Sequence, residues 1–218
     1  AFPAGTPALY GFTPDERKVF GRQFLDVGIA EQTAVAMASA IAKNGGKPVF
    51  NVYSSFIQRT YDQLSQDLCI DSNPATILVQ AASVNGMTDV THLGIFDIPM
   101  ISNIPNLVYI APTTKEDYLA VLDWSIEQTD YPVAIRVPVA KLVSTGKPCT
   151  KNFAELNKYE VAQQGGKIAV IALGSFYGMG EQAAKLIEEK TGTAPTLINP
   201  YYITGVDTEL LESLKKDH

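Results

Sequence analysis

The chain has 218 residues, of which 46% are hydrophobic and 18% are charged, so it can form one large folded domain or two smaller ones. Its formal net charge is −6, and Lys and Arg are scattered rather than gathered in a basic stripe. This pattern argues against nucleic acid as the main partner. No apolar run approaches the roughly 20 residues of a membrane-spanning helix, and no signal peptide is visible.

Cysteine and histidine are both rare in this chain. The two cysteines, Cys69 and Cys149, are far apart, and the two histidines are His92 and the last residue, His218. This is neither the density of a disulfide framework nor the spacing of a metal site. We therefore expect a protein of the reducing cytoplasm, with no metal site within this chain.

Short apolar runs alternate along the chain with longer segments of helical period. The predicted strands cover residues 48–53, 75–80, 107–110, 133–137, 168–173 and 195–198. The predicted helices cover residues 29–43, 56–69, 115–127, 178–189 and 208–216. This alternation predicts a doubly wound α/β fold, in which helices cover both faces of a mostly parallel sheet.

The pattern changes near residues 138–167, which divides the chain. We expect a first domain over residues 1–140, a polar linker over 141–167, and a second, smaller α/β domain over 168–218. No strand precedes the loop-like N-terminal stretch, and a helix is the last predicted element. We therefore expect the first domain to lack its first strand, the second to be incomplete, and the intact protein to be longer in both directions.

Three segments carry more information than the fold class. They are D-V-G-I-A-E-Q at residues 26–32, Y-S-S-F-I-Q-R-T-Y-D-Q at 53–63, and T-H-L-G-I-F-D at 91–97. The last two follow predicted strands. The carboxyl ends of strands are where open α/β sheets build ligand sites.

In this order and at these spacings, the three segments resemble those of the 1-deoxy-D-xylulose-5-phosphate synthases, within the transketolase family of thiamine-diphosphate enzymes. The resemblance is strong over residues 5–138 and weak beyond. It implies a transketolase-type pyrimidine-binding domain followed by the start of the family's C-terminal domain. It also implies a reaction of isoprenoid precursor biosynthesis, in which pyruvate and glyceraldehyde 3-phosphate give 1-deoxyxylulose 5-phosphate and carbon dioxide.

The resemblance assigns cofactor binding to Glu31, Phe56 and Ile29. The residue matching Glu31 contacts a ring nitrogen of the thiamine aminopyrimidine, and a carboxyl there favours the tautomer that activates the cofactor. Glu31 is therefore also a catalytic residue by resemblance, and Phe56 lies against the pyrimidine ring. From the residues alone, Glu31 could be an ordinary acidic residue of a first helical turn, and Phe56 a core residue.

The resemblance assigns substrate binding to Tyr53, Arg59 and His92, and a catalytic role to His92. An arginine at the site entrance can hold a phosphate or carboxylate with two hydrogen bonds. An imidazole can transfer a proton to the acceptor oxygen near neutral pH. The alternatives are a core position for Tyr53, an ion pair of Arg59 with Asp62 or Asp67, and a structural histidine.

The sequence departs from the family pattern at the acceptor end. Ala81 and Val139 stand where the synthases carry two arginines that hold the phosphate of the acceptor, Thr33 replaces a histidine, and Asp89 is an acid displaced by one position. Each lost charge-assisted contact costs about 1.5–3 kcal/mol of binding. These changes predict a slow synthase or a different acceptor.

Three functional hypotheses remain open. The first is a carboligase with a 2-oxo acid donor and an aldehyde acceptor as small-molecule substrates. The second is a subunit of a split transketolase or a 2-oxoacid dehydrogenase, and the third is a non-catalytic scaffold. The chain has no Gly-Asp-Gly segment, so by resemblance the diphosphate and Mg²⁺ are held by another domain of the same protein. A homodimer is expected on the same ground.

Overall fold

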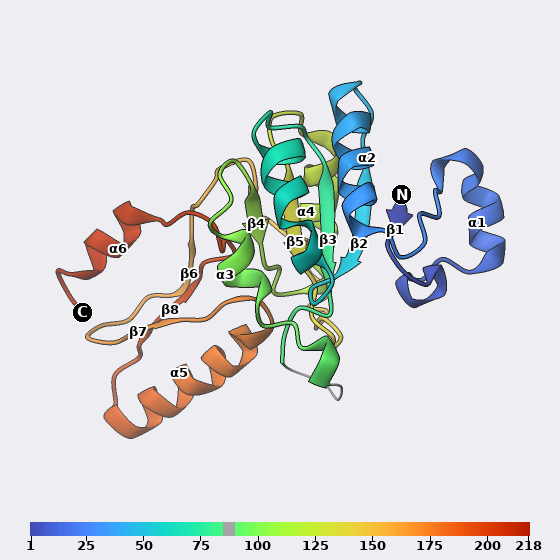
Figure 1. Ribbon diagram of the computed structural model, residues 1–218. Coiled ribbons are helices and arrows are strands. Elements are labelled where there is room, and N and C mark those ends of the chain that lie inside the picture. The colour runs from blue at the N-terminus through green and yellow to red at the C-terminus, as the bar shows by residue number, and fades with distance from the viewer. Residues whose placement is uncertain (85–89) are drawn as a thin grey trace.

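The computed structural model describes residues 1–84 and 90–218. Its larger sheet is parallel throughout, as Figure 1 shows. In spatial order its strands are β1 (Phe2–Pro3), β2 (Val49–Tyr53), β3 (Thr76–Gln80), β5 (Val133–Arg136) and β4 (Val108–Ile110).

Helices cover both faces of this sheet. On one face, α2 (Glu31–Lys43) and the helical segments after β2 pack on Ile77 and Val79 of β3. On the other face, α4 (Lys115–Glu127) packs on a second core that contains Leu78. Successive strand residues therefore enter opposite cores, as expected for a sheet buried on both sides. The predicted doubly wound fold is confirmed.

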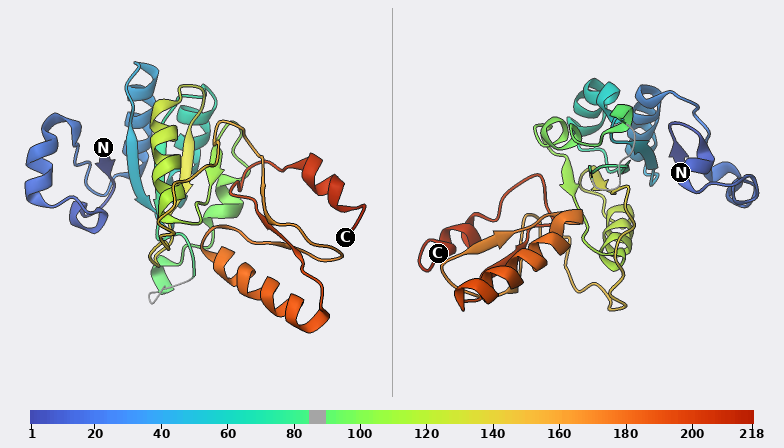
Figure 2. Two further views of the ribbon diagram at one scale, coloured as in Figure 1. Left: turned by 180° about the vertical axis from the view of Figure 1, so that it is seen from behind. Right: turned by 90° about the horizontal axis from the view of Figure 1, so that it is seen from below.

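A smaller mixed sheet forms a second lobe beside the first sheet (Figures 1 and 2). Its strands lie in the order β6 (Glu160–Gln163), β8 (Thr196–Asn199) and β7 (Ala169–Ile171), with β6 antiparallel and β7 parallel to β8. Its helices are α5 (Tyr177–Thr191) and α6 (Thr208–Leu214). The second, smaller α/β unit predicted from the sequence is therefore present.

The segment predicted as a linker is part of the folded structure. Strand β6 lies within it, and its four residues, of which two are apolar and three are exposed, form no apolar run that the sequence analysis could detect. Phe153 from the same segment packs with Tyr201 and Tyr202 in the core under α4. After β8 the chain returns to the first sheet, where the Ala111 amide donates to the Tyr201 carbonyl at 2.8 Å.

The segment after β2 differs from its prediction as one α-helix over residues 56–69. It forms a 3₁₀ turn, η3 (Ile57–Thr60), and a π-helix, η4 (Gln63–Cys69). The Thr60 hydroxyl donates to the Ile57 carbonyl at 2.6 Å, and such side-chain bonds compete with regular helical ones. Wide π turns of this kind occur frequently at functional sites.

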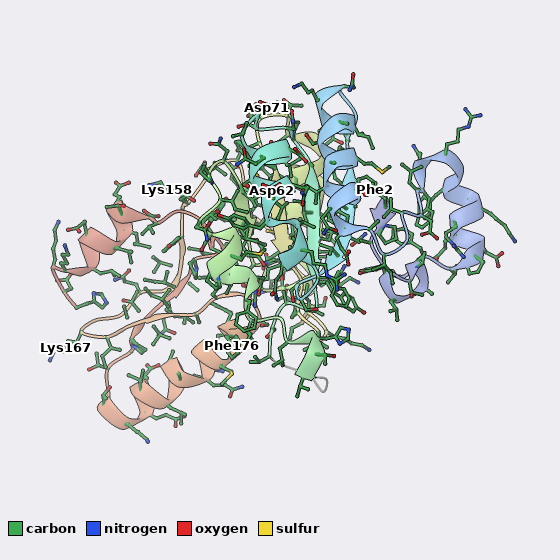
Figure 3. The ribbon with its side chains drawn as sticks, viewed as in Figure 1. Phe2, Asp62, Asp71, Lys158, Lys167 and Phe176 are labelled. Carbon is green, nitrogen blue, oxygen red and sulfur yellow. The ribbon has the colours of Figure 1, made fainter. Side chains whose placement is uncertain are left out.

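The N-terminal residues form a short strand and an arm. Phe2 of β1, labelled in Figure 3, is buried against Phe50, with ring centroids 5.8 Å apart. The sequence predicted no strand here because two residues show no alternation. The arm extends away from the sheet (Figure 1) and returns where the Gly5 amide donates to the Gly28 carbonyl at 3.0 Å. The arm contains η1 (Pro7–Tyr10), α1 (Pro14–Phe20) and η2 (Gly21–Gln23).

Short helical elements complete the described chain. They are η5 (Val90–His92), α3 (Asp97–Ile101) and η6 (Gly174–Phe176). In the part of the chain that the structure describes, no helix has the length and apolar character needed to cross a membrane.

The π-helix places Leu68 in the core, fully buried, and leaves Ile70 64% exposed. We predict that Leu68→Ala lowers the free energy of unfolding by about 2–5 kcal/mol through the cavity it creates. The matched Ile70→Ala variant should change it by no more than about 0.5 kcal/mol. Urea denaturation of the two variants measures both values, and equal losses would contradict the observed helical register.

Candidate cofactor and substrate site

The three informative segments meet at one edge of the first sheet, where β2 and β3 end and α2 begins (Figure 1). Ser54 joins the two strand ends: its amide donates to the Gln80 carbonyl at 2.8 Å, and its buried hydroxyl donates to the Ala81 carbonyl at 3.1 Å. The start of the second segment is therefore held against the end of β3.

Glu31 is the first residue of α2, and only 1% of it is exposed. The turn before it needs Gly28, which has a φ of +65° and whose amide donates to Asp26 Oδ1 at 3.0 Å. Within the described residues, Glu31 Oε1 has no hydrogen-bond partner. A buried carboxylate oxygen without a partner is costly, so this one points to a ligand.

Tyr53, Phe56 and His92 form an aromatic cluster beside Glu31. The Tyr53 and Phe56 rings stack with centroids 5.9 Å apart. The His92 ring meets Phe56 edge-on at 5.2 Å and Tyr53 at 6.2 Å. The Thr91 hydroxyl lies 2.9 Å from His92 Nδ1. The second and third segments thus share one cluster.

Arg59 connects this cluster to Glu31. Its guanidinium lies 5.9 Å from the centre of the Phe56 ring, and Nη1 is 3.8 Å from Glu31 Oε2. Among the described residues, Arg59 forms its ion pair with Glu31 and not with Asp62 or Asp67. Five of the six predicted site residues are therefore linked by direct contacts.

The sixth, Ile29, lies two residues before Glu31 and is 78% exposed, outside these contacts. Ala81 and Val139 stand where the resemblance implies arginines. Ala81 has a φ of +55°, and Val139 is exposed. Asp89, the displaced acid, lies outside the described residues.

The loop that carries His92 is anchored by a buried ion pair. Arg136 Nε donates to Asp97 Oδ2 at 2.7 Å, and Nη2 donates to the Gly94 carbonyl at 3.0 Å. The Tyr109 hydroxyl also donates to Asp97. Burial, and next the charge of Asp97, raises the pKa of Tyr109 well above its usual range, so this hydroxyl remains a donor.

Gly94 fits against the strand ends because it has no side chain. A Cβ there would lie 2.1 Å from the Ala81 carbonyl oxygen and 2.5 Å from Ser54 Oγ. These contacts hold the third segment directly on the ends of β2 and β3.

Residues 9–143 match the family described as the transketolase pyrimidine-binding domain. The chain belongs to the transketolase family. The resemblance inferred from the three segments is thereby confirmed.

Several curated relatives of this transketolase-family chain are named 1-deoxy-D-xylulose-5-phosphate synthase. One from Clostridium perfringens is 40% identical over 204 residues, which are 93% of this chain. One from Clostridium botulinum is 38% identical over 203 residues. The chain spans 32% of the length of each.

Solved structures show the same fold. A protein titled as the inactive beta4 tetramer of a split-gene transketolase matches with a TM-score of 0.84 and 22% identity, over 99% of this chain and 69% of its own. A transketolase mutant from Pichia stipitis matches with a TM-score of 0.80 and 17% identity, over 98% of this chain and 33% of its own.

Sequence reasoning missed three residues of this candidate site. Arg136 and Tyr109 lie on strands, and nothing in their spacing shows that they meet Asp97. Tyr10, on the arm, meets the Tyr53 ring edge-on at 5.4 Å, and its hydroxyl donates to the Ala4 carbonyl at 2.9 Å. Burial, and next Tyr53, raises the pKa of Tyr10 above its usual range, so the added ring is uncharged.

The Asp97–Arg136 ion pair gives a stability prediction. Arg136→Met leaves the fully buried Asp97 carboxyl without its cation, so the free energy of unfolding should fall by about 3–5 kcal/mol. Arg22→Met removes an exposed charge and should change it by no more than about 0.5 kcal/mol. Chemical denaturation measures the free energy of unfolding of both variants. Similar losses in the two would show that the ion pair does not anchor the loop.

Proposed function

We propose that this chain binds the aminopyrimidine half of thiamine diphosphate and supplies the acid–base groups of a carboligase. The unpartnered Oε1 of the buried Glu31 carries this proposal. A nitrogen of a heteroaromatic ring would complete the hydrogen bonding of this oxygen. The residues present therefore fit the cofactor's ring.

The neighbours of Glu31 support the same ligand. Phe56 offers an aromatic face for a flat ring, and its ring is only partly buried. Ile29, exposed at the entrance to α2, supplies an apolar contact at the edge of the same ring. Among the described residues, no group of three or more His, Cys, Asp or Glu side chains could hold a metal ion. We propose that another domain holds Mg²⁺ and the diphosphate, as the family resemblance implies.

When bound, thiamine diphosphate supplies the electron sink that cleavage of a 2-oxo acid needs. Glu31 holds a proton between Oε1 and the ring nitrogen. His92, oriented by its contacts with Phe56 and Tyr53, gives a proton to the oxygen of the aldehyde acceptor. Arg59 and Tyr53 hold the substrates at the entrance.

We propose the reaction for which the relatives are named. In it, a two-carbon unit is transferred from pyruvate to an aldehyde, as in the synthesis of 1-deoxyxylulose 5-phosphate. Because the chain spans 32% of the length of these relatives, we propose that it acts together with a diphosphate-binding domain. A homodimer in the cytoplasm is part of the same proposal.

Glu31→Gln tests the central role of this carboxyl in the enzyme assembled with its diphosphate-binding domain. With thiamine diphosphate and Mg²⁺, release of carbon dioxide from pyruvate should fall by about 10²–10⁴-fold, because the amide cannot share its proton in the same way. Glu188→Gln, an exposed neutralisation on α5, should leave the rate unchanged.

Unchanged release in Glu31→Gln would remove Glu31 from the mechanism. If the unaltered enzyme binds the cofactor and releases no carbon dioxide, the non-catalytic scaffold replaces the carboligase. Turnover of ketose donors in place of pyruvate would favour the transketolase alternative.

A further inference from the structure

The N-terminal arm reaches the candidate site through one aromatic side chain, that of Tyr10. The arm, which contains η1, α1 and η2, leaves the sheet after β1 and returns just before α2 (Figure 1). At its start, the Ala4 amide donates to the Asn51 carbonyl of β2 at 3.0 Å. The next amide, that of Gly5, donates to the Gly28 carbonyl at 3.0 Å. The base of the arm is therefore tied both to β2 and to the turn before α2.

The hydroxyl of Tyr10 is fixed at this base. Tyr10 is the last residue of η1, and its hydroxyl donates to the carbonyl of the fully buried Ala4 at 2.9 Å. A Cβ added to Gly5 would lie 3.3 Å from the Tyr10 hydroxyl oxygen, and Gly5 has a φ of +132°, which residues with a side chain rarely adopt. Gly5 thus leaves room for the hydroxyl, and the hydrogen bond holds the Tyr10 ring in one place.

The ring of Tyr10 packs on Tyr53. It meets the Tyr53 ring edge-on, with centroids 5.4 Å apart and an angle of 64° between the ring planes. Phe56 stacks on Tyr53 at 5.9 Å, and His92 meets it edge-on at 6.2 Å. Of these three neighbouring rings, that of Tyr10 comes from the arm. Since aromatic pairs favour such edge-to-face and stacked geometries, the three rings together limit the orientations open to Tyr53.

Tyr10 also lies within electrostatic reach of Glu31. Burial, then Tyr53 and, to a smaller extent, Glu31 raise the pKa of Tyr10 above its usual range. The hydroxyl therefore stays protonated near neutral pH, keeps its hydrogen bond to Ala4 and adds no charge close to the carboxyl that is proposed to hold the cofactor. Tyr10 thus lies near both the proposed cofactor residue and a proposed substrate residue.

We propose that Tyr10 is a positioning residue, whose ring holds Tyr53 in the orientation in which Tyr53 binds substrate. The inference rests on the proposed function and makes the arm part of the substrate site. Because Tyr10 acts through Tyr53 and not on the cofactor, loss of its ring removes substrate binding that is common to the ground state and the transition state. Such a loss raises KM and leaves kcat nearly unchanged.

Crystal structures of two variants test the positioning itself, with no need of turnover. In Tyr10→Leu, which removes the ring, Tyr53 should turn away from its stacked position, so that the distance between the Tyr53 and Phe56 centroids departs from 5.9 Å. In Tyr10→Phe, which keeps the ring, this distance should be unchanged. An unmoved Tyr53 in Tyr10→Leu would overturn the proposal.

Kinetics of the assembled enzyme with thiamine diphosphate and Mg²⁺ test the consequence. Tyr10→Leu should raise the KM for at least one substrate, pyruvate or glyceraldehyde 3-phosphate, about three- to tenfold, which is the range expected for one aromatic pair. The kcat should change by less than about twofold, and Tyr10→Phe should keep both constants. Phe20→Leu is the matched control, because Phe20 packs on Phe12 within the arm, with centroids 5.9 Å apart. It should leave both KM values unchanged.

A double variant separates positioning from a merely structural role. Tyr10→Leu should have little further effect in Tyr53→Leu, because the ring that it positions is then absent. Additive rises in KM would overturn the proposal, and so would unchanged KM values with a lower free energy of unfolding, which would leave Tyr10 as an anchor of the arm. Equal rises in Tyr10→Phe and Tyr10→Leu would also overturn it, since the hydroxyl would then matter and not the ring. Failure of the unaltered enzyme to release carbon dioxide from pyruvate contradicts the proposed function, whereas the crystal structures still decide whether Tyr10 positions Tyr53.

Discussion

The candidate site at the ends of β2 and β3 depends on the buried carboxyl of Asp97. It has no exposed side-chain surface and is satisfied by Arg136 and Tyr109. Since these partners lie on β5 and β4, the pair ties the loop of the third segment to two strands. Removal of one partner would leave a buried charge unpaired, so the arrangement is held in one geometry. His92 takes its position from this anchored loop.

Glu31 is the contrasting carboxyl. It is as buried as Asp97, yet one of its oxygens lacks a partner within the described residues. The hydrogen bonding of Asp97 is complete, whereas that of Glu31 is not. Because buried polar groups are normally hydrogen-bonded, Glu31 is the carboxyl that is expected to bind a ligand. The aromatic cluster and Arg59 lie beside this carboxyl.

The apolar runs and the three segments of the sequence predicted most of the fold and much of the candidate site. The strands of the first sheet are strongly apolar, and the three segments follow or precede them, so their meeting at one edge followed from the parallel topology. The π-helix could not be predicted, because π turns are rare and the apolar spacing of residues 63–69 is that of an ordinary helix. Strand β6 lacks apolar alternation. Tyr10 and Arg136 reach the site through tertiary contacts, which the spacing of residues in the sequence does not predict.

The central claim is that the free oxygen of Glu31 holds the aminopyrimidine ring. The most direct measurement is a crystal structure of the assembled enzyme with thiamine diphosphate and Mg²⁺, read for the distance from Glu31 Oε1 to the nearest ring nitrogen. We expect a hydrogen bond of about 2.7 Å, with the ring against Phe56. A ring nitrogen bonded to another residue, with Glu31 Oε1 still unpaired, would contradict it.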